Sequence, residues 1–337
     1  MKKRLSLLLA LCLLLTMVPV KAGAVVVNSG PCGDNLQWSL DSQGTLTISG
    51  NGPMKDWPAG ASEEFMVPWL RLRDDIISLV VEEGVTYVGD FAFTYCHNLK
   101  QVSLPKTLTG MGESIFEQCI SLENIVVPDS VTQWKGSTFE ECISLRQVKL
   151  PERITDIPIR FFYKCYSLQQ VEIPKTATNI GFAAFESCQS LTFLELPEGL
   201  TTIGENAFAD CVNLFDIWLP ESLEKIGNKA FAGCVSLTSL IIPPNVKDLG
   251  NAFQKASALE TLIFTGHAPA WRANVFDGVT ATVFYPHNHK GWSKEIRRDY
   301  AGKITWWLMY RISHRNLTFF RESGETAYTG RFRKTIP

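Results

Sequence analysis

The chain has 337 residues, of which 45% are hydrophobic and 20% are charged, and its formal net charge at pH 7 is −2. The charge is uneven, because residues 287–337 hold 11 Lys and Arg against 4 Asp and Glu, whereas residues 25–286 hold 17 against 30. An acidic main body argues against nucleic acid as a partner.

The first 24 residues have the features of a signal peptide. Residues 2–4 are basic, residues 5–20 are largely apolar, and residues 22–24 are small enough for cleavage after Ala24. The apolar stretch is short for a membrane span, and no later segment is long and apolar enough to cross a bilayer. We therefore expect a secreted, extracellular protein, with association at the cell surface as an option and no span in the mature chain.

Residues 25–75 are predicted to form a β-rich N-terminal cap. Leu36, Trp38 and Leu40 alternate with polar residues, a turn follows, and residues 45–49 alternate in the same way, which indicates a β-hairpin. Its apolar face is expected to cover the first repeat, because a stack of repeats needs a cap at each end. Cys32 is expected to be unpaired and buried.

Residues 76–265 are occupied by an internal repeat. Seven cysteines follow one another at a constant spacing of 23 residues: Cys96, Cys119, Cys142, Cys165, Cys188, Cys211 and Cys234. Each has a Phe three residues before it, a Leu three residues after it, aliphatic residues at positions +6 and +8, and a Pro at +9. An eighth copy is one residue short and has Ala256 in place of cysteine.

A constant period of this length indicates a solenoid, in which each copy buries its apolar face against its neighbours. Positions +3 to +8 alternate with the period of a short strand, and the Pro at +9 ends that strand. The Ala-Phe pair before the cysteine predicts a helical or 3₁₀ turn. The predicted fold is therefore a parallel β coil with a 23-residue repeat, short helical turns and β-rich caps at both ends.

The cysteine column has three interpretations. A zinc site favours closely spaced Cys pairs, which this chain lacks. Disulfides suit an exported protein, but thiols on successive copies have parallel Cβ directions, which is poor bridge geometry. The interpretation we favour is a column of structural thiols that pack as small hydrophobic groups and donate to backbone carbonyls.

Positions +5 and +7 of each strand point away from the core and form a continuous outer face. The early copies place mostly polar residues there, whereas the later copies place large apolar residues. This candidate partner-binding patch comprises Phe193, Trp218, Ile241 and Ile263, together with Phe215, which lies beside them at position +4. A solvent-facing apolar patch of this kind indicates an interaction site, with Trp218 as its centre. Two alternatives remain open: the C-terminal segment covers the patch, or two copies of the chain associate through it.

Residues 266–310 are predicted to close the C-terminal end of the stack, with alternating strands around residues 279–286 and 304–310. Trp271, Trp292 and Trp306 are expected to pack inside this cap rather than to bind sugars. His287 and His289 have a metal-like spacing but lack a third ligand nearby, which favours a surface loop. Residues 311–337 form a basic tail that is expected to be disordered.

These motifs resemble a known family. The repeated motif is similar to the BspA-type leucine-rich repeat of bacterial surface proteins. It consists of Leu-x-x-Val-x-Leu/Ile-Pro, then Ile-Gly, then Ala-Phe-x-x-Cys. The flanks, with Cys32-Gly-Asp-Asn-Leu at one end and Val279-Thr-Ala-Thr-Val at the other, resemble modules that accompany these repeats. The resemblance implies a leucine-rich-repeat solenoid with an adhesion or binding role, no catalysis and no cofactor.

The residues themselves give no sign of an enzyme, because no catalytic set or phosphate-binding loop emerges. The expected partner is a protein or glycan on a host or neighbouring cell surface. The alternative function is a passive structural or self-associating component of the cell envelope.

Overall fold

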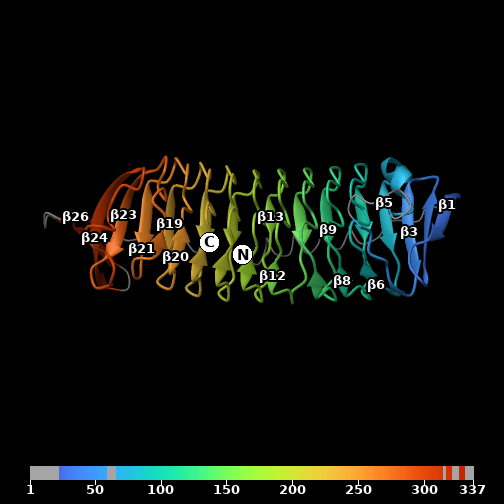
Figure 1. The fold of residues 1–337 in the computed structure, drawn as a ribbon, viewed down its shortest axis with the longest axis horizontal. Coiled ribbons are helices and arrows are strands. Elements are labelled where there is room, and N and C mark those ends of the chain that lie inside the picture. Colours follow the sequence, from blue (N-terminus) through green and yellow to red (C-terminus); the bar gives the residue numbers. More distant parts are fainter. Residues whose placement is uncertain (1–22, 59–65, 314–315, 321–325, 331–337) are drawn as a thin grey trace. The chain divides into compact units, whose positions relative to one another are not determined.

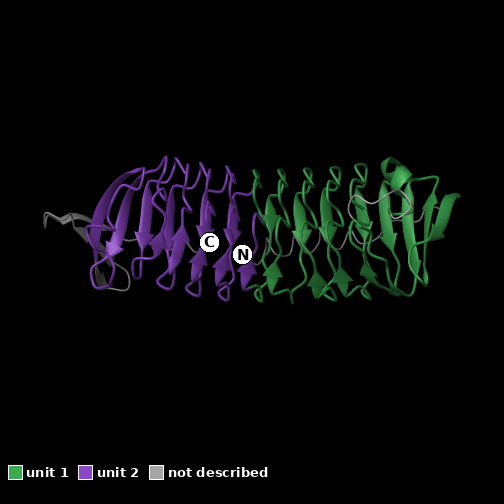
Figure 2. Ribbon diagram, in the orientation of Figure 1, with its two compact units in different colours: residues 1–177, 184–190 green, residues 178–183, 191–337 purple. Residues whose placement is uncertain are grey.

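The computed structural model describes residues 23–58, 66–313, 316–320 and 326–330, and these form two compact units. Unit 1 comprises residues 1–177 and 184–190, and unit 2 comprises residues 178–183 and 191–337 (Figure 2). Most of the expected signal peptide, residues 1–22, lies outside the described residues. Within the described ranges, no helix has the length and apolar character needed to cross a membrane.

Unit 1 begins with an antiparallel meander that passes directly into the parallel repeats. Its strands are β1 (Val26–Pro31), β2 (Leu36–Asp41) and β3 (Thr45–Gly50). The predicted hairpin is confirmed, because β2 and β3 pair antiparallel with Trp38 opposite Ile48. The next pairing is parallel, between β3 and the first repeat strand, β5 (Ser78–Val81).

Each repeat copy in unit 1 contributes two strands, one to each of two series of parallel strands, and breaks in the hydrogen bonding divide these series into several sheets (Figure 1). The strands at positions +5 to +7 are β7 (Gln101–Ser103), β9 (Asn124–Val126), β11 (Gln147–Lys149) and β13 (Gln170–Val171). The second set is β4 (Gly52–Pro53), β6 (Val85–Val88), β8 (Gly110–Met111), β10 (Gln133–Trp134) and β12 (Asp156–Ile157). The sequence pattern predicted only the first set. The 3₁₀ helix η2 (Leu70–Asp75) precedes the repeats.

Unit 2 continues the same pattern. One parallel sheet contains β14 (Asn179–Ile180), β16 (Thr202–Ile203), β18 (Lys225–Ile226), β20 (Asp248–Gly250) and β22 (Ala270–Trp271). The other strands are β15 (Phe193–Glu195), β17 (Asp216–Trp218), β19 (Ser239–Ile242), β21 (Thr261–Phe264), β23 (Thr280–Pro286) and β24 (Lys303–Ser313).

The tail that was expected to be disordered contains two further strands. They are β25 (Asn316–Phe320) and β26 (Thr326–Gly330), and they follow β24 in an antiparallel order. Strand β24 itself runs parallel to β23, with Val283 opposite Trp306. Parallel stacking therefore ends in unit 2 as it begins in unit 1, at an antiparallel meander.

The phenylalanines before the cysteines form the centre of the core. In unit 1, Phe116, Phe139 and Phe162 are fully buried and stack with ring centroids 5.8 and 5.6 Å apart and interplanar angles of 7°. In unit 2, Phe208 and Phe231 stack at 5.5 Å. Each ring therefore packs against the same residue type one copy away, which explains why the period tolerates almost no slip.

The turn before each cysteine makes 3₁₀-type bonds, as when the Cys119 N–H donates to the Phe116 carbonyl at 3.0 Å, but it is not a regular helix. The residues at positions −5 and −1 have positive φ in all seven copies, between 50° and 69°. This conformation directs the N–H groups at −5, −3 and −1 toward the next copy: those of Phe91, Phe93 and Tyr95 donate to carbonyls 22 residues later at 2.8–3.0 Å. A left-handed residue interrupts a right-handed helix, so the turn makes this backbone ladder between copies in addition to its bonds within the copy.

The N-terminal cap satisfies the carbonyls that this ladder leaves at the start of the repeats. The backbone N–H of Trp57 donates to the Asp90 carbonyl at 3.3 Å, and the indole Nε1–H of Trp69 donates to the Ala92 carbonyl at 2.8 Å. Trp69 also stacks on Phe93, with ring centroids 5.6 Å apart. The cap therefore supplies both the apolar cover and the donors that a preceding copy would supply.

Candidate partner-binding surface

Four of the five predicted patch residues lie exposed on neighbouring strands of unit 2. Phe193, Trp218 and Ile241 come from β15, β17 and β19, Phe215 lies directly before β17, and their exposed fractions range from 44% to 57%. The register of β15 with β17 places Phe193 opposite Asp216 and Glu195 opposite Trp218. We refer to Phe193, Phe215, Trp218 and Ile241 as the exposed patch.

The prediction for Ile263 is wrong. Ile263 lies opposite Ile241 in the β19–β21 pairing, but only 2% of it is exposed. It packs with Met309 of β24, and Phe284 and Trp307 lie against the pair. The alternative in which the C-terminal segment covers the patch therefore applies at Ile263, because the outer faces of β23 and β24 are themselves apolar.

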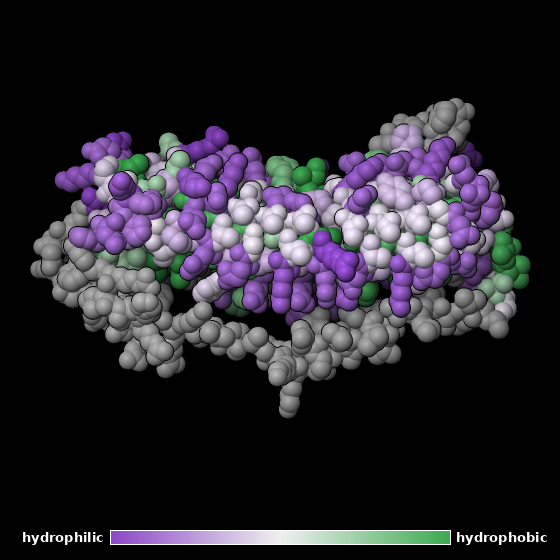
Figure 3. All heavy atoms as spheres, turned by 90° about the horizontal axis from the view of Figure 1, so that it is seen from below, coloured by the Kyte–Doolittle hydropathy of each residue, from purple (hydrophilic) through white to green (hydrophobic). Residues whose placement is uncertain are grey.

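The exposed patch differs from an ordinary protein surface. The face drawn in Figure 3 is dominated by hydrophilic and near-neutral residues, and hydrophobic residues lie there in small separate groups. The exposed patch instead gathers four large apolar side chains on three neighbouring strands, which is a larger apolar group than single scattered residues form.

In the strand segments around the exposed patch, all the charged residues are acidic. Glu195 and Asp216 are exposed and pair opposite patch residues, and Glu260 lies directly before β21. The strand segments 192–195, 215–218, 238–241 and 260–263 contain no Lys or Arg. An aromatic surface with acidic neighbours is complementary to a segment that carries both apolar and basic side chains.

The seven repeat cysteines are all buried and free. Five of them donate a thiol hydrogen bond of 3.0–3.2 Å to the carbonyl of the Phe 26 residues earlier: Cys119, Cys142, Cys165, Cys188 and Cys234. Desolvation raises the pKa of Cys96 and Cys234 to about 12, and it raises the pKa of Cys119 well above its ordinary value. These thiols remain protonated donors, which is unsuitable for a nucleophile or a metal ligand.

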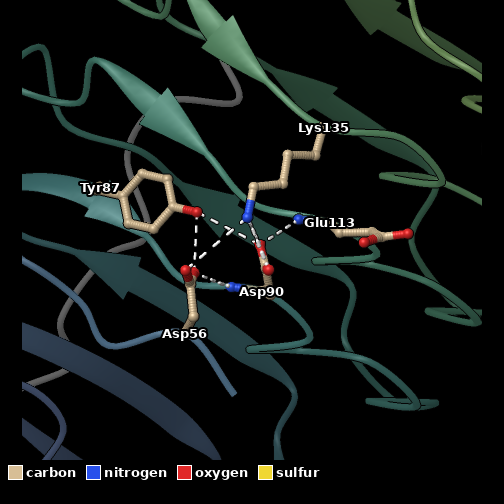
Figure 4. A network of polar contacts seen from close by, with 5 residues as sticks. All are labelled: Asp56, Tyr87, Asp90, Glu113 and Lys135. Atoms are coloured by element: carbon tan, nitrogen blue, oxygen red, sulfur yellow. Dashed lines mark hydrogen bonds and ion pairs between the residues drawn. The ribbon is translucent and has the colours of Figure 1, made fainter. Parts of the chain in front are cut away.

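A polar network joins the cap to the repeats in unit 1 (Figure 4). Lys135 Nζ lies 2.9 and 2.8 Å from the two carboxylate oxygens of Asp90 and 3.9 Å from Asp56 Oδ2. The Tyr87 hydroxyl donates to Asp56 Oδ1 at 2.9 Å, and the Asp90 and Glu113 N–H groups donate to Asp56 and Asp90 at 2.9 and 2.7 Å.

The electrostatics of this network favour a structural role. Burial, followed by the hydrogen bond to Asp56, raises the pKa of Tyr87 well above its ordinary value, so its hydroxyl remains a donor. The hydrogen bond to Asp90 raises the pKa of Lys135. The ammonium group lies between the two carboxylates and compensates their charge, so the network fixes residues 53–57 against β6.

The C-terminal tryptophans pack as predicted. Trp271, Trp292 and Trp306 lie with ring centroids 5.9–6.3 Å apart. His289 instead lies 5.1 Å from His267, a residue of the preceding copy, in an edge-on arrangement that sequence spacing did not suggest. Among the described residues, no group of three or more His, Cys, Asp or Glu is arranged to hold a metal ion.

Comparison with known families identifies the repeat. A family model described as the BspA type leucine rich repeat region matches residues 73–190 and 155–282. The chain belongs to this family. BspA-type leucine-rich repeats are typically non-catalytic scaffolds that bind proteins.

Solved structures that are similar to this chain come from several bacteria. A leucine-rich repeat protein of Eubacterium ventriosum is 19% identical, with 83% of this chain and 84% of that chain covered and a TM-score of 0.44. A T. pallidum leucine rich repeat protein is 26% identical, with coverages of 62% and 91% and a TM-score of 0.47. A leucine rich cell surface protein of Faecalibacterium prausnitzii is 20% identical, with coverages of 81% and 97% and a TM-score of 0.43. The search of curated proteins gave no match.

Proposed function

We propose that this chain is an exported binding module that uses the exposed patch of unit 2 to hold a partner protein at the cell surface. The observation that carries the proposal is the patch itself: Phe193, Phe215, Trp218 and Ile241 are large, apolar and 44–57% exposed on neighbouring strands. Aromatic side chains on a rigid sheet suit a binding hot spot, since they bury much area at small conformational cost.

The partner is a protein segment with apolar side chains flanked by Lys or Arg. Glu195 and Asp216 lie among the patch residues, so a basic flank gains charge complementarity, whereas an acidic segment meets like charge. Export is supported by the sequence of residues 1–24 and by the cell-surface description of the Faecalibacterium prausnitzii protein.

The test uses purified residues 25–337 and an array of cell-surface and matrix proteins and glycans. The double variant Phe193→Ser with Trp218→Ser is compared with a matched control, Gln170→Ser with Glu172→Ser, at the same +5 and +7 positions of a unit 1 copy. We expect the patch variant to lose at least tenfold in affinity, about 1.4 kcal/mol, and the control to bind as wild type.

Equal binding by the two variants would refute the patch as the contact surface. Light scattering on the same samples separates the alternatives. A dimer that dissociates in the patch variant would make self-association the function, and a monomer that binds only glycans would replace the protein partner with a sugar.

A further inference from the structure

An open cavity of about 420 Å³ lies in unit 2, on the sheet formed by β16, β18, β20 and β22 (Figure 1). Its volume falls within the range of about 300–1,000 Å³ that is typical of ligand sites. The strands β15, β17 and β19, which carry the exposed patch, contribute no residue to its lining. The cavity is therefore separate from the exposed patch and independent of the proposed function.

A break in the repeat period coincides with this cavity. Lys225 of β18 pairs with Asp248, 23 residues later, whereas Asp248 pairs with Ala270, 22 residues later, because the eighth copy is one residue short. The register of β20 against β22 shifts again between Asp248 and Gly250. Such irregularities bend a strand and redirect its side chains, so the hollow lies where the sheet departs from its regular form.

Several lining residues have little or no side chain and leave room for a ligand. They are Gly204, Gly227, Gly250 and Ala270. At Gly250 the φ angle is 52°, and an added Cβ would lie 2.5 Å from Asn228 Oδ1. A larger residue at Gly250 would therefore displace the Asn228 amide, which itself lines the cavity.

The polar side chains of the lining supply both donors and acceptors. Lys225 and Arg272 donate hydrogen bonds, Glu205 and Asp248 accept them, and the Asn228 amide does both. The four charged residues are exposed, so their polar groups are accessible to a ligand in the cavity. Two cations face two carboxylates, and the lining has no net charge.

Part of this polar lining is held in place before a ligand arrives. Asp248 Oδ1 accepts the Gly250 N–H at 3.1 Å, and the Asn228 amide donates to Glu205 Oε2 at 3.4 Å. Among the described residues, the side chains of the two cations make no hydrogen bond or ion pair, so both are available as donors. Groups that are already oriented bind a ligand at a smaller entropic cost.

The mixture of groups indicates a neutral ligand that is rich in hydroxyl groups. Each hydroxyl both donates and accepts, so it can pair with either kind of side chain. A polyanion or a polycation would meet as many like charges as opposite ones. A peptide strand has no free edge to join here, because β16, β18 and β20 are each paired on both sides.

The spacing of the strands suits an extended glycan. Thr202, Lys225 and Asp248 lie in one row across β16, β18 and β20, because each is the register partner of the next. Neighbouring strands lie about 4.8 Å apart, which is similar to the length of one sugar unit in an extended chain. Trp271 packs with the other cap tryptophans and lines the cavity at its β22 end.

We propose that this cavity binds an extended neutral glycan that runs across β16, β18, β20 and β22. Glu205 and Asp248 accept hydrogen bonds from its hydroxyl groups, and Lys225, Asn228 and Arg272 donate to them.

The test is calorimetric titration of residues 25–337 with four neutral hexasaccharides: cellohexaose, maltohexaose, mannohexaose and N-acetylchitohexaose. Hexagalacturonate serves as an anionic control. We expect at least one neutral hexasaccharide to bind at millimolar concentration or below, and hexagalacturonate to bind at least tenfold more weakly. The patch variant Phe193→Ser with Trp218→Ser should bind the neutral glycan as wild type, because its substitutions lie outside the cavity.

Lys225→Ala and Asp248→Ala should each weaken binding of the neutral glycan at least tenfold, since each removes a charged hydrogen-bonding group. The matched control is Asp156→Ala, which removes an exposed carboxylate at the equivalent position of a unit 1 copy, in β12. It should bind as wild type. If Asp248→Ala does not fold because the Gly250 N–H loses its acceptor, Lys225→Ala decides.

Three results would overturn the proposal. They are absence of binding by all four neutral hexasaccharides, wild-type glycan binding by folded Lys225→Ala, and tighter binding of hexagalacturonate than of any neutral glycan. Loss of glycan binding in the patch variant alone would also overturn it, because the glycan would then belong to the exposed patch.

Discussion

At the scale of single residues, the sulfur atom of a repeat cysteine both packs in the core and donates a hydrogen bond to the preceding copy. Five thiols donate to a carbonyl one copy earlier at 3.0–3.2 Å, as Cys142 does to Phe116. Desolvation raises the pKa of Cys142 and Cys165 above the ordinary value of a thiol, so both remain protonated at neutral pH. A cysteine therefore fills a small apolar site and completes a hydrogen bond in the same position.

We expect these buried thiols to be unreactive in the folded protein. Residues 25–337 contain eight cysteines, all of them buried. A thiol reagent at pH 8 should label fewer than one per chain over the time in which a short peptide thiol reacts fully, and all eight should react in denaturant. The measurement is mass spectrometry of labelled protein, and rapid labelling of a repeat cysteine without denaturant would contradict the buried column.

Glu83 gives a prediction that depends on pH. Its carboxylate oxygens accept the N–H groups of Lys106 and Thr107 at 3.0 and 3.2 Å, and the first of these bonds is the main cause of its lowered pKa. Because the folded-state pKa lies below the unfolded value of about 4.3, Glu83 adds stability above that pH and loses it as the pH falls through the folded-state value.

Glu83→Gln should therefore lower the melting temperature at pH 7, and the difference from wild type should narrow as the pH falls below about 4. Glu82→Gln, at the exposed neighbouring position, is the control and should melt as wild type. Calorimetry across pH gives the measurement, and a difference independent of pH would show that the ionised carboxylate is not the stabilising group.

At the scale of elements, the left-handed turn is the unit that makes stacking possible. Positive φ at positions −5 and −1 directs N–H groups toward the next copy, so the turn adds backbone bonds between copies to the bonds that it makes within its own copy. Non-glycine residues in this conformation cost about 1–2 kcal/mol each, and the ladder must offset that cost.

Substitutions at position −1 of two adjacent copies in unit 2 should shift stability in opposite directions. Lys255 has φ 60° and is exposed, whereas Gly233 holds the same position with φ 69°. Lys255→Gly relieves about 1–2 kcal/mol of strain and adds about 0.4–1 kcal/mol of unfolded-state entropy, so a net gain of about 0.5–1 kcal/mol is expected.

Gly233→Ala should lose stability for the same reason, and its added Cβ would also lie 2.2 Å from Asp210 Oδ1. Urea unfolding at equilibrium measures both changes. Lys255→Val is the control and should destabilise, because a β-branched residue tolerates positive φ poorly. A stabilising Gly233→Ala would show that the turn carries no strain.

At the scale of the whole molecule, the constant period makes the copies interchangeable. From β14 to β20, residues pair with partners 23 positions away, as Thr202 does with Lys225. Each copy contacts its neighbours, so stability is expected to be a sum of copies and their interfaces.

Deletion of residues 212–234 should therefore leave a folded protein. The cut removes β17 and β18 together and joins Cys211 to residue 235 in the original phase of the repeat. Circular dichroism should retain the β signal, and the urea m-value should fall with the surface removed. Deletion of residues 212–223 removes β17 alone and shifts the later copies out of the 23-residue phase, so it should abolish cooperative unfolding. If both deletion variants unfold cooperatively, a whole copy is not the unit that must be removed, and the prediction is refuted.

The cysteine period predicted most of this architecture, since it located the first strand of each copy, the buried columns and the outward positions. The second sheet was missed because two-residue strands such as β16 are too short to alternate. The left-handed turns were also missed, although the sequence carries a signal: none of the fourteen residues at −5 and −1 is Val, Ile or Thr.

The error at Ile263 has a different origin. Its position in the repeat is correct, but Met309 covers it from 46 residues later, and no local pattern encodes that contact. The contacts of the N-terminal cap with the first copy were invisible for the same reason, because Trp57 and Trp69 come from irregular segments that the repeat does not describe. Periodic positions were predictable, and contacts made by the caps were not.

The donors of Trp57 and Trp69 have a consequence for assembly. They occupy the Asp90 and Ala92 carbonyls, which a further copy of the repeat would otherwise bond. On the adjoining sheet, the edge strand β1 carries a register shift near Val26 and ends at Pro31, both of which hinder pairing with another strand. These features hinder a second chain from stacking its repeats on the N-terminal face of unit 1, and so they oppose end-to-end polymerisation there.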